Sequence, residues 1–194
     1  KLYIARMQDA SNRMRTLIQD LLNFSRIRSK GQELAPVDLN EIVRGVVSDL
    51  EVRLEQSGGR VEVDTLPTVL ADPLQMRQVF QNLIGNALKF KKSGVPPVVK
   101  VMYKPKDATH RIVVQDNGIG FEQQYAERVF EIFQRLHGRS DFEGTGMGLA
   151  IVKKIVERHV GSIRAESEPG KGARFIVTLP NHEEDPNALV KKTI

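Results

Sequence analysis

The chain has 194 residues, 40% of them hydrophobic and 27% charged, which is the ordinary balance of one average globular domain with an appendage. It contains no cysteine, so disulfide scaffolds and thiolate chemistry are excluded, and no apolar run approaches the roughly 20 residues of a membrane helix. The net charge of +5 comes from basic residues scattered among acidic ones, which argues against a nucleic-acid partner. We expect a cytoplasmic chain, with any membrane attachment supplied by segments outside this sequence.

The first segment predicts a long amphipathic helix that runs up to the polar stretch RIRSKGQELAP. Apolar or small residues recur at alternating steps of four and three, at Tyr3, Met7, Ala10, Met14, Leu17, Leu21 and Phe24. Ile4, Ile18 and Leu22 widen one flank of this heptad seam. A face this wide needs more than one partner helix, which favours a four-helix bundle. The alternative is a helix folded back on its own domain.

The remaining pattern predicts a mixed α/β domain. A helix capped by Asp38 or Asn40 is expected to end at the pair Gly58 and Gly59, and Pro73 opens a helix that extends to about residue 91. Strands are expected at 60–64, 68–71, 98–104, 110–116, 162–167 and 174–179, with a helix at 147–159 and a loose polar tail from about 181. Because hairpins outnumber single-helix crossovers, we expect an α/β sandwich with one mixed sheet and helices on one face.

One narrow polar stripe marks the helix that begins at Pro73. Placed at about 100° per residue, the stripe contains Gln75, Gln78, Asn82, Asn86 and Lys89, and a broad apolar face lies opposite. A helix this apolar is largely buried, so the stripe lines an enclosed or partly enclosed space. Amide oxygens suit Mg²⁺ and a lysine suits phosphate, but a solvated face with two incidental asparagines explains the stripe equally well.

Two glycine-rich segments follow this helix. In QDNGIGF, Asp116 ends an apolar strand, where it can accept a hydrogen bond from an amine such as that of adenine. Gly118 and Gly120 let the backbone approach a ligand there. GTGMGLAIVKKIVERH places three glycines before a helix whose N–H groups can bind phosphate. It lacks the lysine of a P-loop and the upstream strand of a dinucleotide fingerprint, and either segment alone is a weak signal.

In this order, the motifs resemble those of sensor histidine kinases. NLIGNALKF resembles their N box, DNGIG the G1 box, VFEIF the F box and GTGMGLAIVKKIVERH the G2 box. GKGARFIVTLP is similar to the closing glycine turn and strand, RMRTLIQDLLNFSRI to the second helix of the dimerisation hairpin, and PVDLNEIV to the start of the catalytic domain. FQRLH and the short lid after it look closest to phytochrome-like and PAS-linked kinases.

This resemblance covers about residues 10–180 and implies a Bergerat-type two-layer α/β sandwich behind a long N-terminal helix. It divides the chain into the second helix of a truncated dimerisation or phosphotransfer hairpin at 1–34, an ATP-binding catalytic domain at 35–181 and a polar tail at 182–194. The implied partners are a second copy of the kinase chain, joined through the N-terminal helix, and the receiver domain of a response regulator.

The resemblance also implies roles in binding ATP and Mg²⁺. Asn86 would coordinate the metal, Asn82 would support it or contact phosphate, and Lys89 would touch the phosphates. Asp116 would bind the adenine amine in a pocket shaped by its two neighbouring glycines, Gly118 and Gly120.

A second group of implied roles concerns the lid between Gln134 and Gly144. Phe130 and Phe133 would anchor this lid, with Phe133 also near the nucleotide, and Arg135 would supply a basic phosphate contact. The residues that would close over the nucleotide are Gly144, Thr145, Gly146, Gly148 and Leu149. Catalysis would rest on Asn82, Lys89 and Arg135.

The residue at position 82 bears on the type of reaction. Gyrase-, MutL- and heat-shock-type ATPases resemble this family but typically carry a glutamate there, which activates water as a general base. An amide cannot take up a proton, so we expect an ATP:protein-histidine phosphotransferase rather than a rapid ATPase. The alternatives are a non-catalytic nucleotide-binding regulatory module, another ATPase of the wider superfamily, and a serine kinase.

The sequence departs from the family in two places. The acceptor motif His-[Asp/Glu]-x-x-x-Pro is missing, because His110, His137 and His159 lack it and HEEDP at His182 has its proline one residue too early. The acceptor is therefore expected outside this sequence, and this chain is not expected to autophosphorylate. Val160 stands where the family usually has glycine, in the turn after the G2 helix.

Overall fold

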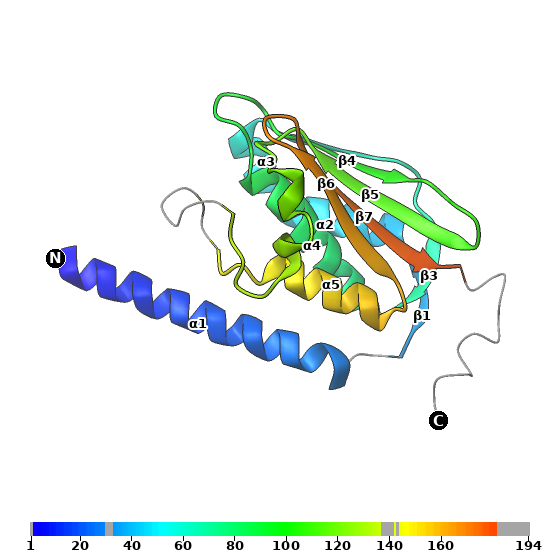
Figure 1. The fold of residues 1–194 in the computed structure, drawn as a ribbon, viewed down its shortest axis with the longest axis horizontal. Helices are drawn as coiled ribbons and strands as arrows, with labels where there is room; N and C mark the ends of the chain where they lie inside the picture. The colour runs from blue at the N-terminus through cyan, green and yellow to red at the C-terminus, as the bar shows by residue number, and fades with distance from the viewer. Residues whose placement is uncertain (1, 30–32, 137–141, 143, 182–194) are drawn as a thin grey trace.

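The structure is a computed structural model that describes residues 2–29, 33–136, 142 and 144–181. A long helix, α1 (Leu2–Ser29), lies beside an α/β sandwich (Figure 1). In the sandwich, α2 (Leu39–Asp49), α4 (Pro73–Lys89) and α5 (Gly148–Arg158) pack on one face of a sheet. A short helix, α3 (Glu51–Ser57), and two 3₁₀ turns, η1 (Gln123–Tyr125) and η2 (Arg128–Phe130), complete the helical elements of the described ranges.

The main sheet has five strands in the spatial order β2-β4-β5-β7-β6. Their bounds are β2 (Arg60–Val63), β4 (Val98–Tyr103), β5 (Thr109–Asp116), β6 (Ser162–Glu168) and β7 (Gly172–Pro180). Only the β2–β4 pair is parallel, and the other three pairs are antiparallel. The predicted mixed sheet with helices on one face is thereby confirmed.

A separate ribbon of two strands was not predicted. β1 (Ala35–Asp38) pairs antiparallel with β3 (Thr68–Ala71), and Val37 stands opposite Val69, both buried. The sequence indicated β3 but gave no sign of β1, because four residues that include Pro36 do not show a strand period. The ribbon connects α1 to the sandwich and brings Asp38 to the start of α2, where its side chain caps the helix through the Asn40 N–H.

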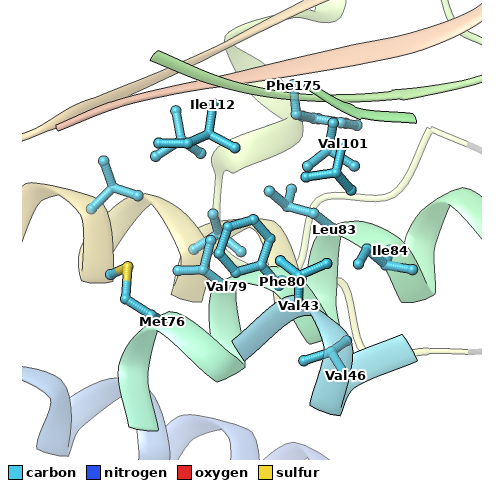
Figure 2. Packing of buried hydrophobic residues seen from close by; sticks show 14 of the residues in the cluster. Val43, Val46, Met76, Val79, Phe80, Leu83, Ile84, Val101, Ile112 and Phe175 are labelled. Atoms are coloured by element: carbon cyan, nitrogen blue, oxygen red, sulfur yellow. The ribbon is translucent and has the colours of Figure 1, made fainter. Parts of the chain in front are cut away.

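The core lies between the sheet and the helices, and α4 runs through its middle (Figure 2). Phe80 and Leu83 of α4 are buried beneath Val101 and Phe175 of the sheet. On the other side, α2 packs against α4 and contributes Val43 and Val46 to the same core. Each such buried side chain stabilises the fold by about 1.5–3 kcal/mol. This packing fixes the rotation of α4 about its own axis and so determines where its polar stripe points.

One helix boundary differs from the sequence expectation, and the turn at Val160 has an unusual backbone conformation. The single helix predicted up to Gly58 is broken into α2 and α3 at Leu50, whose φ and ψ of −98° and 3° leave the helical region. Val160, which follows α5, has φ +57°, a left-handed conformation that is rare for a β-branched residue. A glycine would adopt this turn without strain.

One side of the helix α1 packs against the domain near its C-terminus, and another side is exposed. Near its C-terminus Phe24 packs against the domain and Ile27 is buried, so this part folds back as the second of the two alternatives had it. Among the described side chains of the seam before Phe24, Leu17 is half-buried and the others are exposed, at Ile4, Met7, Met14, Ile18, Leu21 and Leu22. The four-helix bundle stays a prediction for that face. No helix in the described part of the chain combines the length and apolarity needed to cross a bilayer.

Candidate functional site

One cavity of about 300 Å³ opens between α4, the end of β5 and the start of α5. Most of the predicted site residues line it, namely Asn82, Asn86, Lys89, Asp116, Gly120, Arg135, Gly144, Thr145, Gly146, Gly148 and Leu149. Two predicted residues do not line it, Gly118 and Phe133. We call the side formed by Asp116, Gly120 and Ala173 the sheet end, and the side formed by Asn82, Asn86, Lys89 and residues 144–148 the helix end.

The polar stripe of α4 is divided between two tasks. Gln78, Asn82, Asn86 and Lys89 line the cavity. Gln75 is buried elsewhere, and it hydrogen-bonds the carbonyl of Ile27 at 3.4 Å and receives a hydrogen bond from Arg158 at 2.9 Å. The stripe is therefore not a solvated face, because its first residue ties α4 to α1 and α5 while the others face a cavity.

Asp116 is held firmly at the sheet end. Its Oδ1 accepts hydrogen bonds from the N–H of Gly118 at 2.7 Å and from the N–H of Ala173 at 3.2 Å. Burial raises the pKa of Asp116, and these two hydrogen bonds and Lys92 oppose that rise. Both of these hydrogen bonds use Oδ1, so Oδ2 is the oxygen that a ligand amine in the cavity would meet.

Glycine is required at three positions around this carboxylate. A Cβ on Gly118 would lie 2.4 Å from the carbonyl oxygen of Phe90, and one on Gly120, whose φ is +63°, would lie 2.2 Å from that of Glu168. Gly172 was given no individual role from the sequence, yet a Cβ there would lie 2.1 Å from the carbonyl oxygen of Asp116. Gly118 thus shapes the site by holding Asp116 rather than by lining the cavity.

At the helix end, the loop of residues 144–148, the glycine loop, leads into α5. The side chain of the N-cap residue, Met147, makes no capping hydrogen bond to the first turn of α5, so the N–H groups of that turn suit an anion. Gly148 lies close to Asn82, since a Cβ would be 2.7 Å from its Oδ1, and a Cβ on Gly144 would be 2.9 Å from the Lys89 Nζ. The amides of α4 and the amino terminus of α5 therefore face one another.

The sequence gave no role to Asp20 of α1, which also lines the cavity. Thr145 Oγ1 donates a hydrogen bond of 2.6 Å to Asp20 Oδ2 and accepts one of 3.3 Å from the Met147 N–H. A contact between residues 125 positions apart leaves no local signal in the sequence. Only the docking of α1 on the domain reveals it.

Two aromatic residues in the segment before the glycine loop differ in burial. Phe130 is buried and packs edge-on against Phe175, with ring centroids 6.3 Å apart. Phe133 is 53% exposed with φ +64°, and its proposed contact with nucleotide stays a prediction. Arg135 donates hydrogen bonds to the carbonyls of Gly144 and Phe142, so its guanidinium joins the two described sides of this segment.

The described histidines are structural, as expected. His159 is buried, its Nδ1–H donates to the Ile155 carbonyl at 2.8 Å, and its Nε2 accepts from the Asp72 N–H at 3.0 Å. Burial lowers the pKa of His159, which agrees with a neutral ring. His110 shares a hydrogen bond of 3.0 Å with the hydroxyl of Tyr103. His137 and His182, and the tail at 182–194, lie outside the described residues.

Comparison with known proteins places these features in context. A family model described as histidine kinase-, DNA gyrase B- and HSP90-like ATPase matches residues 71–183. Phytochrome-like protein Cph1 of Synechocystis sp. is 44% identical over 167 residues, which cover 86% of this chain and 22% of Cph1. Sensor protein RprX of Bacteroides fragilis is 34% identical over 186 residues, which cover 92% of this chain and 36% of RprX.

Two solved structures show the same arrangement of elements. Full-length ShkA in complex with AMPPNP superimposes with a TM-score of 0.74 at 31% identity, covering 92% of this chain and 38% of ShkA. The nucleotide-free catalytic domain of histidine kinase ThkA gives a TM-score of 0.64 at 28% identity, covering 77% of this chain and 97% of that domain. The chain thus spans the whole of one solved catalytic domain but only 22% of its relative Cph1.

Proposed function

This chain belongs to the family of histidine kinase-, DNA gyrase B- and HSP90-like ATPases, and we propose that its cavity holds Mg-ATP for transfer of the γ-phosphate to a histidine. It is the ATP-binding catalytic domain of a sensor histidine kinase. The observation that carries the proposal is the cavity itself. A buried carboxylate lies at one end of the cavity, and two asparagines, a lysine and a helix amino terminus lie at the other end.

The sheet end suits adenine. Asp116 uses Oδ1 for the N–H groups of Gly118 and Ala173, which leaves Oδ2 to accept a hydrogen bond from the exocyclic amine. Ile119, Val129 and Phe175 supply apolar walls for the ring. A base fixed here would direct its phosphates toward the helix end.

The helix end suits a triphosphate with its metal. Asn82 and Asn86 offer neutral amide oxygens of the kind that Mg²⁺ accepts, and Lys89 offers a positive charge. No group of three acidic or histidine side chains within the described ranges could hold a metal alone, so phosphate oxygens and water would complete the coordination shell. When bound, Mg²⁺ would neutralise charge on the phosphoryl group being transferred.

The residues at this end favour transfer over hydrolysis. Asn82 donates through Nδ2 to the carbonyl of Gln78 at 2.9 Å, and its Oδ1 faces Gly148. An amide cannot remove a proton from water. Asp20 is the carboxylate that lines the cavity near Thr145, and its Oδ2 already accepts a hydrogen bond from that residue. We therefore expect slow ATP hydrolysis and faster transfer to a histidine brought to the cavity.

That histidine belongs to another segment. His110 and His159 are engaged in hydrogen bonds within the domain and do not line the cavity. In the proposed kinase, α1 is the second helix of a dimerisation hairpin whose first helix carries the acceptor, and the exposed seam of α1 packs against a second copy. A response regulator would then receive the phosphoryl group, which would complete a two-component pathway.

The experiment that tests the proposal has two arms. The first is calorimetric titration with Mg-ATP, where we expect binding on the order of −5 to −8 kcal/mol. The second mixes the protein and γ-labelled ATP with a chain that supplies the acceptor helix, where we expect an acid-labile phosphohistidine on that chain. Asn86→Ala should remove the Mg²⁺ dependence of binding, whereas Gln81→Ala should not, because Gln81 is an exposed amide of α4 outside the cavity.

Three outcomes are distinguishable. Binding with transfer supports the kinase. Binding without transfer to any acceptor chain identifies a nucleotide-binding regulatory module. A folded protein that binds no nucleotide contradicts the proposal.

A further inference from the structure

One face of α1 is clasped to the catalytic domain at three points spaced by four and three residues. Asp20 accepts the hydrogen bond of Thr145, and Lys154 of α5 lies 3.8 Å from the centre of the Phe24 ring. The carbonyl of Ile27 accepts a hydrogen bond from Gln75 of α4. Residues this far apart lie along one side of a helix. The same side of α1 therefore touches the glycine loop, α5 and α4, which are the elements that form the helix end of the cavity.

The first of these points lies within the cavity. Among the described residues that line it, the carboxylates are Asp116 at the sheet end and Asp20 beside Thr145. Thr145 lies between Gly144, which is close to the Lys89 Nζ, and the start of α5. The Asp20 carboxylate thus stands at the end that carries the cations, and its negative charge lowers the positive potential there.

The hydrogen-bond geometry gives Asp20 a second effect. A threonine hydroxyl has one proton, and Thr145 donates that proton to Asp20. The lone pairs of the same oxygen are then free to accept from the Met147 N–H directly before α5. Asp20 therefore fixes the orientation of a hydroxyl that holds the glycine loop in shape.

We propose that Asp20 of α1 is a positioning residue for the glycine loop, and that its charge makes the docked position of α1 bind ATP less well relative to ADP. The proposal rests on the function proposed above. ATP brings one more phosphate, and hence more negative charge, to the end of the cavity where Asp20 stands. The position of α1 then determines which nucleotide the domain holds, through one side chain and without movement of the sheet.

The charge effect is tested by measuring ATP and ADP affinities of the wild type and Asp20→Asn by calorimetry. Asparagine keeps an oxygen that can accept from Thr145 but removes the charge. We expect the ratio of ATP to ADP affinity to rise about three- to tenfold, with a smaller rise at high salt because salt screens partly exposed charges. Asp64→Asn is the matched control, since Asp64 is an exposed carboxylate outside the cavity. An unchanged ratio in Asp20→Asn overturns the charge effect.

The positioning effect is tested at Thr145, where the carboxylate is left in place. Thr145→Val removes the hydroxyl at nearly constant shape and with it both of its hydrogen bonds, to Asp20 and from the Met147 N–H. Because these bonds hold the glycine loop in shape, we expect about fivefold weaker binding of both nucleotides. Thr145→Ser should restore the wild-type affinities. A valine variant that binds like the wild type, or a serine variant as weak as valine, overturns it. Melting curves by circular dichroism verify that each variant is folded.

This test separates the two proposals. If the wild type binds neither nucleotide, the proposed function fails and this inference fails with it. If the wild type binds both and Asp116→Asn abolishes binding, but the variants at Asp20 and Thr145 behave like the wild type, only this inference fails.

Discussion

The two ends of the cavity are built in different ways. At the sheet end, Asp116 is held by backbone N–H groups of two strand ends, and neighbouring glycines allow contacts that no other residue fits. At the helix end, side chains from α1 and α4 meet a loop before α5. The sheet end is thus held by backbone hydrogen bonds of the sheet, whereas the helix end combines α4 of the core with a loop and with one side chain of α1. Under the proposed function, the base would meet the sheet and the phosphates would meet a loop whose contacts include α1.

The largest expected effect is a loss of ATP affinity when Asp116 at the sheet end is replaced. In Asp116→Asn, the side-chain oxygen can still accept from Gly118 and Ala173, but the amide NH₂ then faces the adenine amine, so a donor meets a donor. We expect ATP affinity to fall on the order of 100-fold, because a buried donor is left unpaired. Calorimetry measures this loss. A variant that binds within about threefold of the wild type would show that adenine is recognised elsewhere.

Two glycine-to-alanine substitutions compare the sheet end with the glycine loop. Gly120→Ala forces a Cβ to 2.2 Å from the carbonyl of Glu168 in the sheet, and we expect unfolding free energy to fall by about 2–4 kcal/mol. Gly146→Ala brings a Cβ to 2.9 Å from the backbone of Phe133, in a loop that can move aside, so ATP binding should suffer more than stability. Gly58→Ala is the control, because it shares φ +63° with Gly120 but has open space around it. Urea unfolding that ranks Gly146→Ala above Gly120→Ala in damage would contradict the comparison.

A smaller effect, on stability, is expected at Val160 in the turn that follows α5. Val160 has φ +57° and is 63% exposed, so Val160→Gly should relieve backbone strain and raise the unfolding free energy by about 1 kcal/mol. Val160→Ala should give little of this gain, since alanine also disfavours a left-handed backbone. Because the turn lies at the opposite end of α5 from the glycine loop and does not line the cavity, ATP affinity should stay at its wild-type value. Destabilisation by glycine would show that the valine side chain contributes a contact.

The smallest effect concerns pH and Asp116. Because burial raises the folded pKa of Asp116 above its unfolded value, the folded state binds the proton more readily. The nucleotide-free protein should therefore lose the associated stability as pH rises through the unfolded and then the folded pKa, and regain it on acidification. Asp116→Asn should remove this dependence. Thermal unfolding of both proteins from pH 4 to pH 7 measures the difference, and parallel curves would contradict the assigned cause.

The same contrast explains what the sequence could predict. Glycines and amides that a ligand site demands stand in short motifs, and the resemblance of these motifs to histidine kinases implied one site for Asn82, Asn86, Asp116 and the glycine loop, which do line one cavity. Asp20 could not be found, because its role depends on α1 docking against a loop 125 residues away. Gln75 shares the period of the stripe but turns to Ile27 and Arg158, since helical periodicity gives a direction and not a partner. Phe133 matched a motif, and because its side chain is 53% exposed and does not line the cavity, its contact with nucleotide stays a prediction.

Because α1 is long, a small rotation about its contact at Asp20 produces a large displacement at its amino-terminal end. From Asp20 to Leu2 the helix extends about 27 Å, so a tilt of about 5° about the clasp displaces the amino-terminal end by about 2 Å. A displacement of that size at the far end corresponds to the same rotation of about 5°, which moves a side chain about 5 Å from the helix axis by roughly 0.5 Å. A shift of that size is enough to strain the hydrogen bond of 2.6 Å between Thr145 and Asp20. A displacement at the amino-terminal end of α1 would thus be coupled to the hydrogen bond between Asp20 and Thr145 in the cavity.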